Sequence, residues 1–347
     1  MLHILGEKDW SLDKDYSPDM PTDGEFAGGT GTATDPYLIS TPAQLDNVRK
    51  NLSAHYKLIK DIDLANWGDW EPISPFIGSF DGDGHVIKNM TIDTAVLWYA
   101  YDGGFSSAGL FGYVGGGTSY PYISNIGIVN SKVNIITRNT GSVYAGGIAG
   151  YVYSGSIYNC YNTGEISVNA DYACVGGIMG FGDLTGRTAN CYNTGVVRAT
   201  SSNGNAFAGG IVGRIISSGS DRLPNMLNHF NTGEVSAVSN YSNAYAGGIV
   251  GNGSASNSYS TGQVKATAVN SAYAGGISGM GSATNCYYLN TSASNAVGNS
   301  GPLTNVLALT EAQMKQQASF VGFDFATVWA ISPTINNGYP YLRGMQP

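Results

Sequence analysis

Charged side chains are scarce in this sequence. Asp, Glu, Lys and Arg make up 12% of the 347 residues, roughly half the share of an ordinary soluble domain. The stretch 141–290 holds five acidic and five basic residues, and no basic stripe occurs along the chain. Because phosphate contacts need grouped cations, we expect no nucleic-acid partner.

Metal-binding and membrane-spanning patterns are missing too. A zinc site needs about four Cys or His ligands at close spacing, whereas the four cysteines form no CxxC pair and the four histidines are scattered. We therefore expect no metal and no cofactor. No apolar run reaches the roughly 18 residues that cross a bilayer, so we expect no membrane insertion. Met1–Trp10 is too short and too charged for a signal peptide, and we interpret the chain as a piece of a longer secreted protein.

Glycine, by contrast, is abundant, and much of it lies in an internal repeat. Gly-Gly-Ile begins at intervals of 30, 33, 38 and 28 residues, at Gly146, Gly176, Gly209, Gly247 and Gly275. An Asn-x-aromatic segment follows each copy, and in the first four it leads into Thr-Gly and a short alternating stretch. Runs of β-forming residues between Gly, Asn and Ser predict short strands and turns.

A unit of this length cannot bury an apolar face alone, so it must stack on its neighbours. The repeat therefore predicts an all-β, right-handed parallel β-helix with three short strands in each coil of 28–38 residues. Stacking would align one asparagine per coil into a ladder of side-chain amides, namely Asn159, Asn190, Asn228, Asn257 and Asn285. Two aromatic columns would also form, Tyr161, Tyr192, Phe230, Tyr259 and Tyr287 in one, and Tyr144, Phe207, Tyr245 and Tyr273 with Cys174 in the other. We interpret both as internal stacks.

The Gly-Gly-Ile-x-Gly … Asn-x-Tyr-Asn-Thr-Gly pattern resembles the GLUG motif repeats of bacterial cell-surface proteins, including segments that flank the catalytic part of IgA-type metallopeptidases. Residues 31–92, with the run Gly78-Ser79-Phe80-Asp81-Gly82-Asp83-Gly84-His85, are similar to the opening coils of such proteins. The resemblance implies a β-helical surface or adhesin module, located extracellularly or at the cell surface. Those peptidases need an HExxH helix that grips zinc, and this sequence has no His-Glu pair.

We expect residues 1–25 to be a flexible leader and residues 26–343 to form one β-helix domain. In that domain, 26–100 would form the N-terminal cap and first coils, 101–290 the repeats, and 291–343 a C-terminal helix and cap. Thr41–Leu52 has apolar residues at helical spacing, and Thr310 with Gln313 fits a capping box. The aromatic tail Phe323–Leu342 is expected to seal the last coil, where core and strand edges would otherwise be exposed.

Asp61, Asp63, Asp81 and Asp83 are the candidates for catalysis. A glycosidase needs two carboxylates about 5–10 Å apart, and adjacent coils could bring these together. Asp-Gly dipeptides are also ordinary turn residues, and Asp61 and Asp63 flank a buried Ile in an alternating strand, so a structural role is favoured. The run Asp81–Gly84 faintly resembles part of a Ca²⁺ loop but lacks its further carboxylates, so a Ca²⁺ site there is kept only as an alternative to the expected absence of a cofactor. His85 is interpreted as a surface residue.

Cys160 and Cys191 occupy the same position in neighbouring coils, close enough for a disulfide. Inward-facing cysteines in a stacked column also fill space as thiols, and buried thiols are favoured.

Tyr99, Tyr101, Tyr120 and Tyr122 lie outside the regular repeat, in insertions that span 98–101 and 113–122. Loops on a rigid scaffold commonly carry binding residues, so these tyrosines are the predicted ligand contacts. A third insertion, 217–227, would form a loop on one side.

The sequence therefore predicts a non-catalytic extracellular adhesion or binding module of a bacterial surface protein that contacts a glycan or a host or matrix surface. Two alternatives stay open: a polysaccharide-active hydrolase or lyase that uses the acidic set, and a structural spacer of a larger surface protein. A carboxylate pair in a sugar-sized groove would favour the enzyme, and a flat aromatic patch would favour binding.

Overall fold

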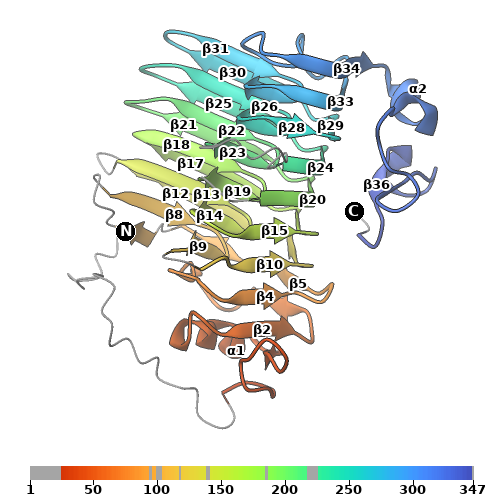
Figure 1. Ribbon diagram of the computed structural model, residues 1–347. Coiled ribbons are helices and arrows are strands. Elements are labelled where there is room, and N and C mark those ends of the chain that lie inside the picture. The colour runs from red at the N-terminus through yellow and green to blue at the C-terminus, as the bar shows by residue number, and fades with distance from the viewer. Residues whose placement is uncertain are drawn as a thin grey trace.

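Short strands of alternating apolar and polar residues stack into a parallel β-helix (Figure 1). The computed structural model describes residues 25–93, 96–98, 104–116, 119–137, 141–183, 187–216 and 226–345. Equivalent residues of successive repeats pair in register, so that Ile166 lies beside Val197 and Val197 beside Val235. The predicted β-helix is confirmed.

Each coil first crosses a long bent sheet. The first arm of the bent sheet contains β1 (Tyr37–Ile39), β2 (His55–Leu58), β4 (Ser79–Asp81), β10 (Tyr122–Ser124), β15 (Ser156–Tyr158) and β28 (Ala255–Ser256). The second arm contains β3 (Ile62–Asp63), β5 (Val86–Lys88), β11 (Gly127–Val129), β16 (Tyr161–Asn162) and β29 (Tyr259–Ser260). The strands that run through the bend are β20 (Arg187–Asn193), β24 (Met226–Asn231), β33 (Ala283–Leu289) and β34 (Leu303–Leu309).

The chain then runs away from the bent sheet along an outgoing sheet and comes back along a returning sheet. These two sheets face each other, and we call the pair the lobe. The outgoing sheet contains β6 (Thr91–Ile92), β12 (Lys132–Ile136), β17 (Glu165–Ala170), β21 (Val197–Ser201), β25 (Val235–Ser239) and β30 (Val264–Ala268). The returning sheet contains β7 (Val96–Trp98), β8 (Phe105–Ala108), β13 (Ser142–Gly146), β18 (Tyr172–Gly176), β22 (Ala206–Gly209), β26 (Ala244–Gly247) and β31 (Ala272–Gly275). The closing sheet completes the coil with β9 (Phe111–Val114), β14 (Ala149–Val152), β19 (Met179–Gly182), β23 (Val212–Ile215), β27 (Val250–Asn252) and β32 (Ser278–Met280).

The expectation of three strands per coil is wrong because of this lobe. Its two strands are separated only by short polar turns, such as residues 202–205 between β21 and β22. Small inward residues such as Ala199 and Ala206, which are 1% and 0% exposed, let the two strands pack closely. The double glycine marks the next bend, from the returning to the closing sheet. A Cβ at Gly177 would lie 2.2 Å from the carbonyl oxygen of Gly210 in the next coil, so only glycine fits there.

A second ladder of asparagines, which the sequence pattern did not reveal, lies inside the solenoid. Asn162 Nδ2 donates to Asn193 Oδ1 at 2.8 Å, and Asn193 Nδ2 donates to Asn231 Oδ1 at 2.8 Å. All three side chains are buried, and each amide also donates to the carbonyl of the glycine two residues later. The Tyr-Asn-Thr-Gly part of the repeat thus pairs the buried polar groups of a tight bend.

The N-terminal end of the solenoid is closed. Helix α1 (Pro42–Asp46) and the 3₁₀ turn Asn47–Lys50 bury Leu45 and Val48, and Thr41 caps the helix by accepting a hydrogen bond from the Gln44 amide. The free edge of β1 is paired as well, because Ala27 N donates to Leu38 O and Leu38 N donates to Gly28 O. The helix expected within Thr41–Leu52 is confirmed.

The C-terminal tail packs on the flank of the bent sheet, beside β24, β33 and β34 (Figure 1). Helix α2 (Glu311–Met314) has the predicted capping box between Thr310 and Gln313. It is followed by 3₁₀ turns and a small antiparallel pair, which are Gln317–Ser319, Asn336–Gly338, β35 (Trp329–Ala330) and β36 (Tyr341–Leu342). The expectation that the tail seals the last coil is wrong. The tail covers an aromatic column instead, and its residues Phe320, Phe323 and Trp329 pack against Phe230, Tyr259 and Tyr287.

Candidate functional site

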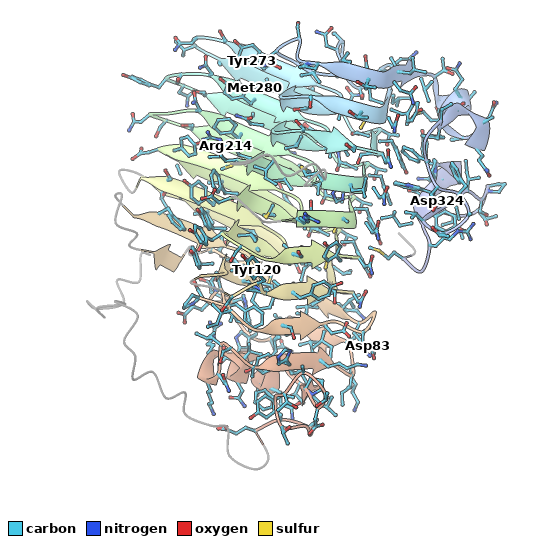
Figure 2. All side chains as sticks on the ribbon, viewed as in Figure 1. Asp83, Tyr120, Arg214, Tyr273, Met280 and Asp324 are labelled. Carbon is cyan, nitrogen blue, oxygen red and sulfur yellow. The ribbon has the colours of Figure 1, made fainter. Side chains whose placement is uncertain are left out.

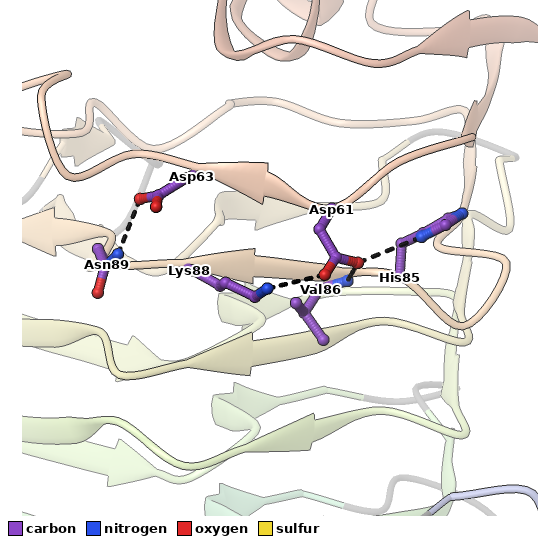
Figure 3. A network of polar contacts seen from close by, with 6 residues as sticks. All are labelled: Asp61, Asp63, His85, Val86, Lys88 and Asn89. Carbon is purple, nitrogen blue, oxygen red and sulfur yellow. Dashed lines mark hydrogen bonds and ion pairs between the residues drawn. The ribbon is translucent and has the colours of Figure 1, made fainter.

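Asp61 lies in a polar network on the second arm of the bent sheet (Figure 3). Its carboxylate accepts hydrogen bonds from Lys88 Nζ at 2.8 Å and from the backbone amide of Val86 at 3.3 Å, and lies 3.2 Å from His85 Nδ1. The hydrogen bond from Lys88 is the main cause that holds the pKa of Asp61 below its usual range. Asp61 is therefore an ionised partner of a surface lysine.

The other three acidic candidates are also occupied by structural partners. Asp63 accepts from Asn89 Nδ2 at 2.8 Å and from the Ala65 amide at 2.9 Å, and the bond from Asn89 is the main cause of its lowered pKa. Asp81 accepts from Asn125 Nδ2 and from the Asp83 amide, both at 2.9 Å. Asp83 pairs with Lys57 at 3.1 Å.

These hydrogen-bond and ion-pair partners bear on whether the four aspartates could act as catalytic groups or as metal ligands. A catalytic acid of a glycosidase needs a raised pKa so that it holds a proton near neutral pH, whereas the pKa values of Asp61 and Asp63 are lowered. A Ca²⁺ ion would need six to eight oxygen ligands. In the part of the chain that the structure describes, no group of three or more His, Cys, Asp or Glu side chains could hold a metal ion.

Asp81 is the first rung of the asparagine ladder. The ladder continues from Asn125 through three of the predicted positions, because Asn159 donates to Asn125, Asn190 to Asn159 and Asn228 to Asn190, at 2.9–3.1 Å. Higher up, Asn285 donates to Asn257 and Asn305 donates to Asn285. The five predicted asparagines all have φ between +48° and +60°, a region that asparagine tolerates better than most residues. The ladder thus stabilises the bend of the sheet.

Two of the four predicted ligand tyrosines lie on an exposed face, and Tyr99 and Tyr101 lie outside the described residues. Tyr120 is 73% exposed and Tyr122 is 46% exposed, and Figure 2 shows Tyr120 near the level of β10 and β15. The Tyr122 ring stacks on that of Tyr158, with centroids 5.2 Å apart. We call Tyr120, Tyr122 and Tyr158 the tyrosine patch.

Polar side chains continue the tyrosine patch along the first arm of the bent sheet. Strand register places Ser79 and Ser156 on either side of Tyr122, with His55 below Ser79 and Arg187 above Ser156. His55 Nδ1 lies 2.5 Å from Ser79 Oγ. Sequence reasoning missed Tyr158, His55 and Arg187 because only strand pairing shows that they share a face with Tyr122. The result is a surface of phenol rings, hydroxyls, an imidazole and a guanidinium along one arm of the sheet.

The two predicted aromatic columns are confirmed as stacks over most of their members, while Tyr287 lies edge-on to Phe320 and Phe323, and Tyr144 stacks on Phe181. Tyr161, Tyr192, Phe230 and Tyr259 stack with planes within 4–7° of parallel, and the tail covers this column through Trp329, which is 0% exposed. In the second column Phe207, Tyr245 and Tyr273 stack at 4.8 and 5.1 Å. Within these columns neighbouring rings cover the ring faces, and the first column also lies under the tail, so the columns are poor platforms for a sugar ring. Tyr122 differs because it has a ring, Tyr158, on one side only, and strand register places Ser79 on the other.

All four cysteines are free, buried thiols, and for Cys160 and Cys191 this is the state favoured from the sequence. Cys191 and His229 lie in adjacent coils of one interior column, and both are 0% exposed. The Cys191 amide donates to His229 Nδ1 at 3.2 Å, and His229 Nε2 lies 3.1 Å from the Thr188 carbonyl oxygen. These contacts fit the neutral ring protonated at Nε2. The column is sealed from solvent, so its groups pack the core.

A family model, The GLUG motif, matches residues 141–169. This segment contains the first complete Gly-Gly-Ile copy and its Asn-Cys-Tyr-Asn-Thr-Gly continuation. The resemblance to GLUG-motif repeats is confirmed. Among the described residues, no helix is long and apolar enough to cross a membrane.

Two long proteins are similar to parts of the chain. A "Putative Gly-rich membrane protein" of Evansella cellulosilytica is 42% identical over 97 residues, which are 26% of this chain and 11% of that protein. "Halomucin" of Haloquadratum walsbyi is 33% identical over 203 residues, which are 55% of this chain and 2% of that protein. The chain thus matches only a small share of the length of these relatives.

A solved structure is similar over almost the whole chain. It is the crystal structure of a "putative immunoglobulin A1 protease" from Bacteroides ovatus, with a TM-score of 0.63 and 25% sequence identity. The match covers 95% of this chain and 99% of that one. The two chains therefore share one overall fold.

Proposed function

We propose that this GLUG-motif β-helix is a non-catalytic recognition module of a surface protein, and that the tyrosine patch contacts a glycan. The proposal rests on the solvent exposure of two neighbouring tyrosines, since Tyr120 is 73% exposed and Tyr122 is 46% exposed. Tyrosine offers a large, rigid and amphipathic contact area at a low cost in conformational entropy. Tyr122 and Tyr158 stand on strands of a rigid sheet, so little ordering is needed on binding.

Polar neighbours of the tyrosine patch supply the hydrogen bonds that a sugar needs. Ser79 and Ser156 flank Tyr122, and Arg187 lies one strand further along. Hydroxyl groups can both donate and accept, and the guanidinium donates only. A ring face with hydroxyls at its rim suits a neutral sugar, and Arg187 would favour a glycan that carries a carboxylate.

The relatives support a surface location. One similar protein is named a Gly-rich membrane protein and another is named halomucin, and both are many times longer than the matched segment. The chain would then act as one module of a long protein outside the cell. A non-catalytic role is favoured because Asp61, Asp81 and Asp83 are engaged by Lys88, Asn125 and Lys57.

Binding and turnover can be measured in one experiment. The purified chain is applied to a glycan and matrix-protein array, and released oligosaccharides are followed in parallel. Immunoglobulin A1 is included as a protein substrate, because the similar solved structure is named for that activity. We expect binding to glycans without release of any fragment.

Tyr120→Ala with Tyr122→Ala should reduce that binding at least about tenfold, a loss of about 1.4 kcal/mol. Tyr241→Ala is the matched control, because Tyr241 is 66% exposed and lies on the distant turn between β25 and β26. Fragment release that disappears in Asp81→Asn or Asp83→Asn would establish the enzyme instead. No binding and no release would leave a structural spacer.

A further inference from the structure

A column of side chains on the outer face of the closing sheet changes its chemistry halfway along the solenoid. Strand pairing aligns one residue per coil, and from the N-terminal coils upward these are Tyr113, Tyr151, Phe181, Arg214, Asn252 and Met280. The first three members are rings, and the change begins at Arg214. A cation in a column of rings breaks the local pattern of the repeat, and such departures are expected at functional sites.

A second column faces the first across the corner between the returning and the closing sheet. It consists of Tyr144, Cys174, Phe207, Tyr245 and Tyr273. In the lower coils rings from both sides fill this corner, since the rings of Tyr144 and Phe181 stack with centroids 4.9 Å apart. In the upper coils Asn252 and Met280 take the place of rings on the closing sheet, and Met280 is 38% exposed. We call Arg214, Asn252, Met280 and Tyr273 the arginine corner, and Figure 2 shows three of its members at successive levels of the solenoid.

Arg214 is a half-buried cation that has no carboxylate partner in the described part of the chain. The central carbon of its guanidinium lies 5.1 Å from the centre of the Phe207 ring and 5.8 Å from that of Phe181. Nη1 donates to the Tyr172 hydroxyl at 2.8 Å, whereas Nε is buried and donates to no described residue. Because a guanidinium has five N–H donors and a full charge, these surroundings leave it short of an anion.

We propose that the arginine corner binds an acidic glycan whose carboxylate pairs with Arg214. A planar guanidinium presents two parallel N–H groups to a carboxylate, and the rings beside it keep water away and strengthen the pair. Asn252 follows Arg214 one coil later, at the spacing of paired strands, about 4.8 Å. Neither the Asn252 amide nor the Tyr273 hydroxyl makes a hydrogen bond within the described chain. Both groups can donate and accept, so they suit the hydroxyls of a sugar.

A sugar fits the surroundings of Arg214 better than an acidic peptide does. Peptides that bind to sheets gain affinity from main-chain hydrogen bonds with a free strand edge. The strands that carry Phe207, Arg214 and Asn252 are β22, β23 and β27, and each of them is paired on both sides. The corner therefore offers side-chain groups around Arg214 but no backbone edge, and side-chain amides and hydroxyls are the partners that sugar hydroxyls use.

The arginine corner is separate from the tyrosine patch. Tyr122 and Tyr158 stand on β10 and β15 of the bent sheet, whereas Arg214 stands on β23 of the closing sheet. The stretch 141–290 holds five acidic and five basic residues, so it does not repel an anion as a whole. Each site can bind when the other binds nothing, and each is tested by its own variant.

Isothermal titration calorimetry of the full chain with trigalacturonate tests the carboxylate contact. We expect binding that weakens at high salt, because the ion pair is only half-buried and is screened. The methyl ester of the same sugar should bind at least about tenfold more weakly, since it cannot form the charge-assisted pair. This comparison leaves the fold untouched. Hexaglutamate is the peptide probe, and binding of hexaglutamate as tight as that of trigalacturonate would overturn the choice of a glycan.

Arg214→Gln should weaken the binding of trigalacturonate at least about tenfold, and Arg214→Lys should weaken it less, because the charge is kept without the planar fork. Arg198→Gln is the matched control, since Arg198 lies on the outgoing sheet and is already paired with two glutamates. The double variant Tyr120→Ala with Tyr122→Ala should bind trigalacturonate as the unmodified chain does. No binding at millimolar concentration, equal binding by Arg214→Gln, or a loss in the double tyrosine variant instead would contradict this site.

Discussion

Asn190 Nδ2 donates a hydrogen bond of 3.1 Å to Oδ1 of Asn159, which holds the same place one coil earlier. Asn228 in turn donates to Asn190 at 3.0 Å. Asn190 is therefore both a donor and an acceptor, and its φ of +53° places it in the left-handed region. Asparagine thus both adopts the positive φ that the bend needs and supplies the donor and acceptor that link neighbouring coils.

Replacing Asn190 by Ala should lower the free energy of unfolding by about 3–4 kcal/mol. Two side-chain hydrogen bonds are lost, at about 1 kcal/mol each, and a β-carbon with no compensating bond at positive φ costs about 1–2 kcal/mol. Asn190→Gly loses only the hydrogen bonds and should be milder. Urea unfolding of both variants measures the difference. Equal losses would mean that the backbone conformation contributes nothing.

The asparagine column could be predicted because one Asn recurs at a fixed place in every repeat, and register alone then aligns it. The interior ladder of Asn162, Asn193 and Asn231 could not, since the same Asn-Thr-Gly run also reads as a simple turn. Burial decides between the two, and burial depends on which face of each coil turns inward. The tyrosine patch could be predicted only in part for the same reason. Tyr122 lies in an insertion that departs from the repeat, whereas Tyr158 lies inside a regular repeat, where nothing in the sequence shows that it faces outward.

The position of the tail follows from packing that no sequence pattern gives. The aromatic residues of the tail predicted that it would pack against the solenoid, but not which surface of the solenoid it would cover. Tyr259 donates a hydrogen bond to the Pro340 carbonyl and Tyr287 donates to that of Val321, which attaches the tail to the ring column. The lobe end stays open.

Trp329→Ala should destabilise this attachment by about 3–5 kcal/mol, the usual cost of removing a buried large aromatic side chain. Trp329 is 0% exposed and stacks on Phe323 at 4.6 Å. Faster hydrogen exchange in residues 310–345 and increased binding of a hydrophobic dye should accompany the loss. Trp67→Ala, at a position that is 38% exposed, is the control. Equal stability of the two variants would show that the tail does not depend on Trp329.

All four thiols should be unreactive in the folded protein and reactive in denaturant. Each cysteine is 0% exposed, so reagents cannot reach the sulfur atoms in the folded chain. Burial also raises the pKa of Cys286 to about 12, which lowers its thiolate fraction, whereas hydrogen bonds with Cys160 and His229 outweigh burial at Cys191 and lower its pKa to about 6, so that Cys191 is protected by its burial alone. A colorimetric thiol assay should find none before unfolding and four in guanidinium chloride. Thr304→Cys, placed on an exposed strand position, should add one reactive thiol in the folded state. Two thiols after unfolding would instead show a disulfide between Cys160 and Cys191.

Asp61 should make a small contribution to stability that is lost in acid. Its pKa in the folded chain is lowered, chiefly by the hydrogen bond from Lys88, so the ionised form is favoured by folding. That contribution is present above the unfolded pKa of the carboxyl group and disappears as the pH falls through the folded one. Both side chains are more than 40% exposed, so screening keeps the effect below about 1 kcal/mol.

Asp61→Asn should therefore lower the free energy of unfolding near neutral pH and have no effect in strong acid, where the carboxyl group is protonated in both states. The difference should shrink in high salt, because an exposed ion pair is screened. Asp35→Asn is the control, since Asp35 is exposed and its carboxylate makes no hydrogen bond or ion pair with any described residue. Urea unfolding at several pH values gives the comparison. A loss in Asp61→Asn that persists unchanged at low pH would mean that the side chain acts through packing, and the ion pair with Lys88 would then contribute nothing to the fold.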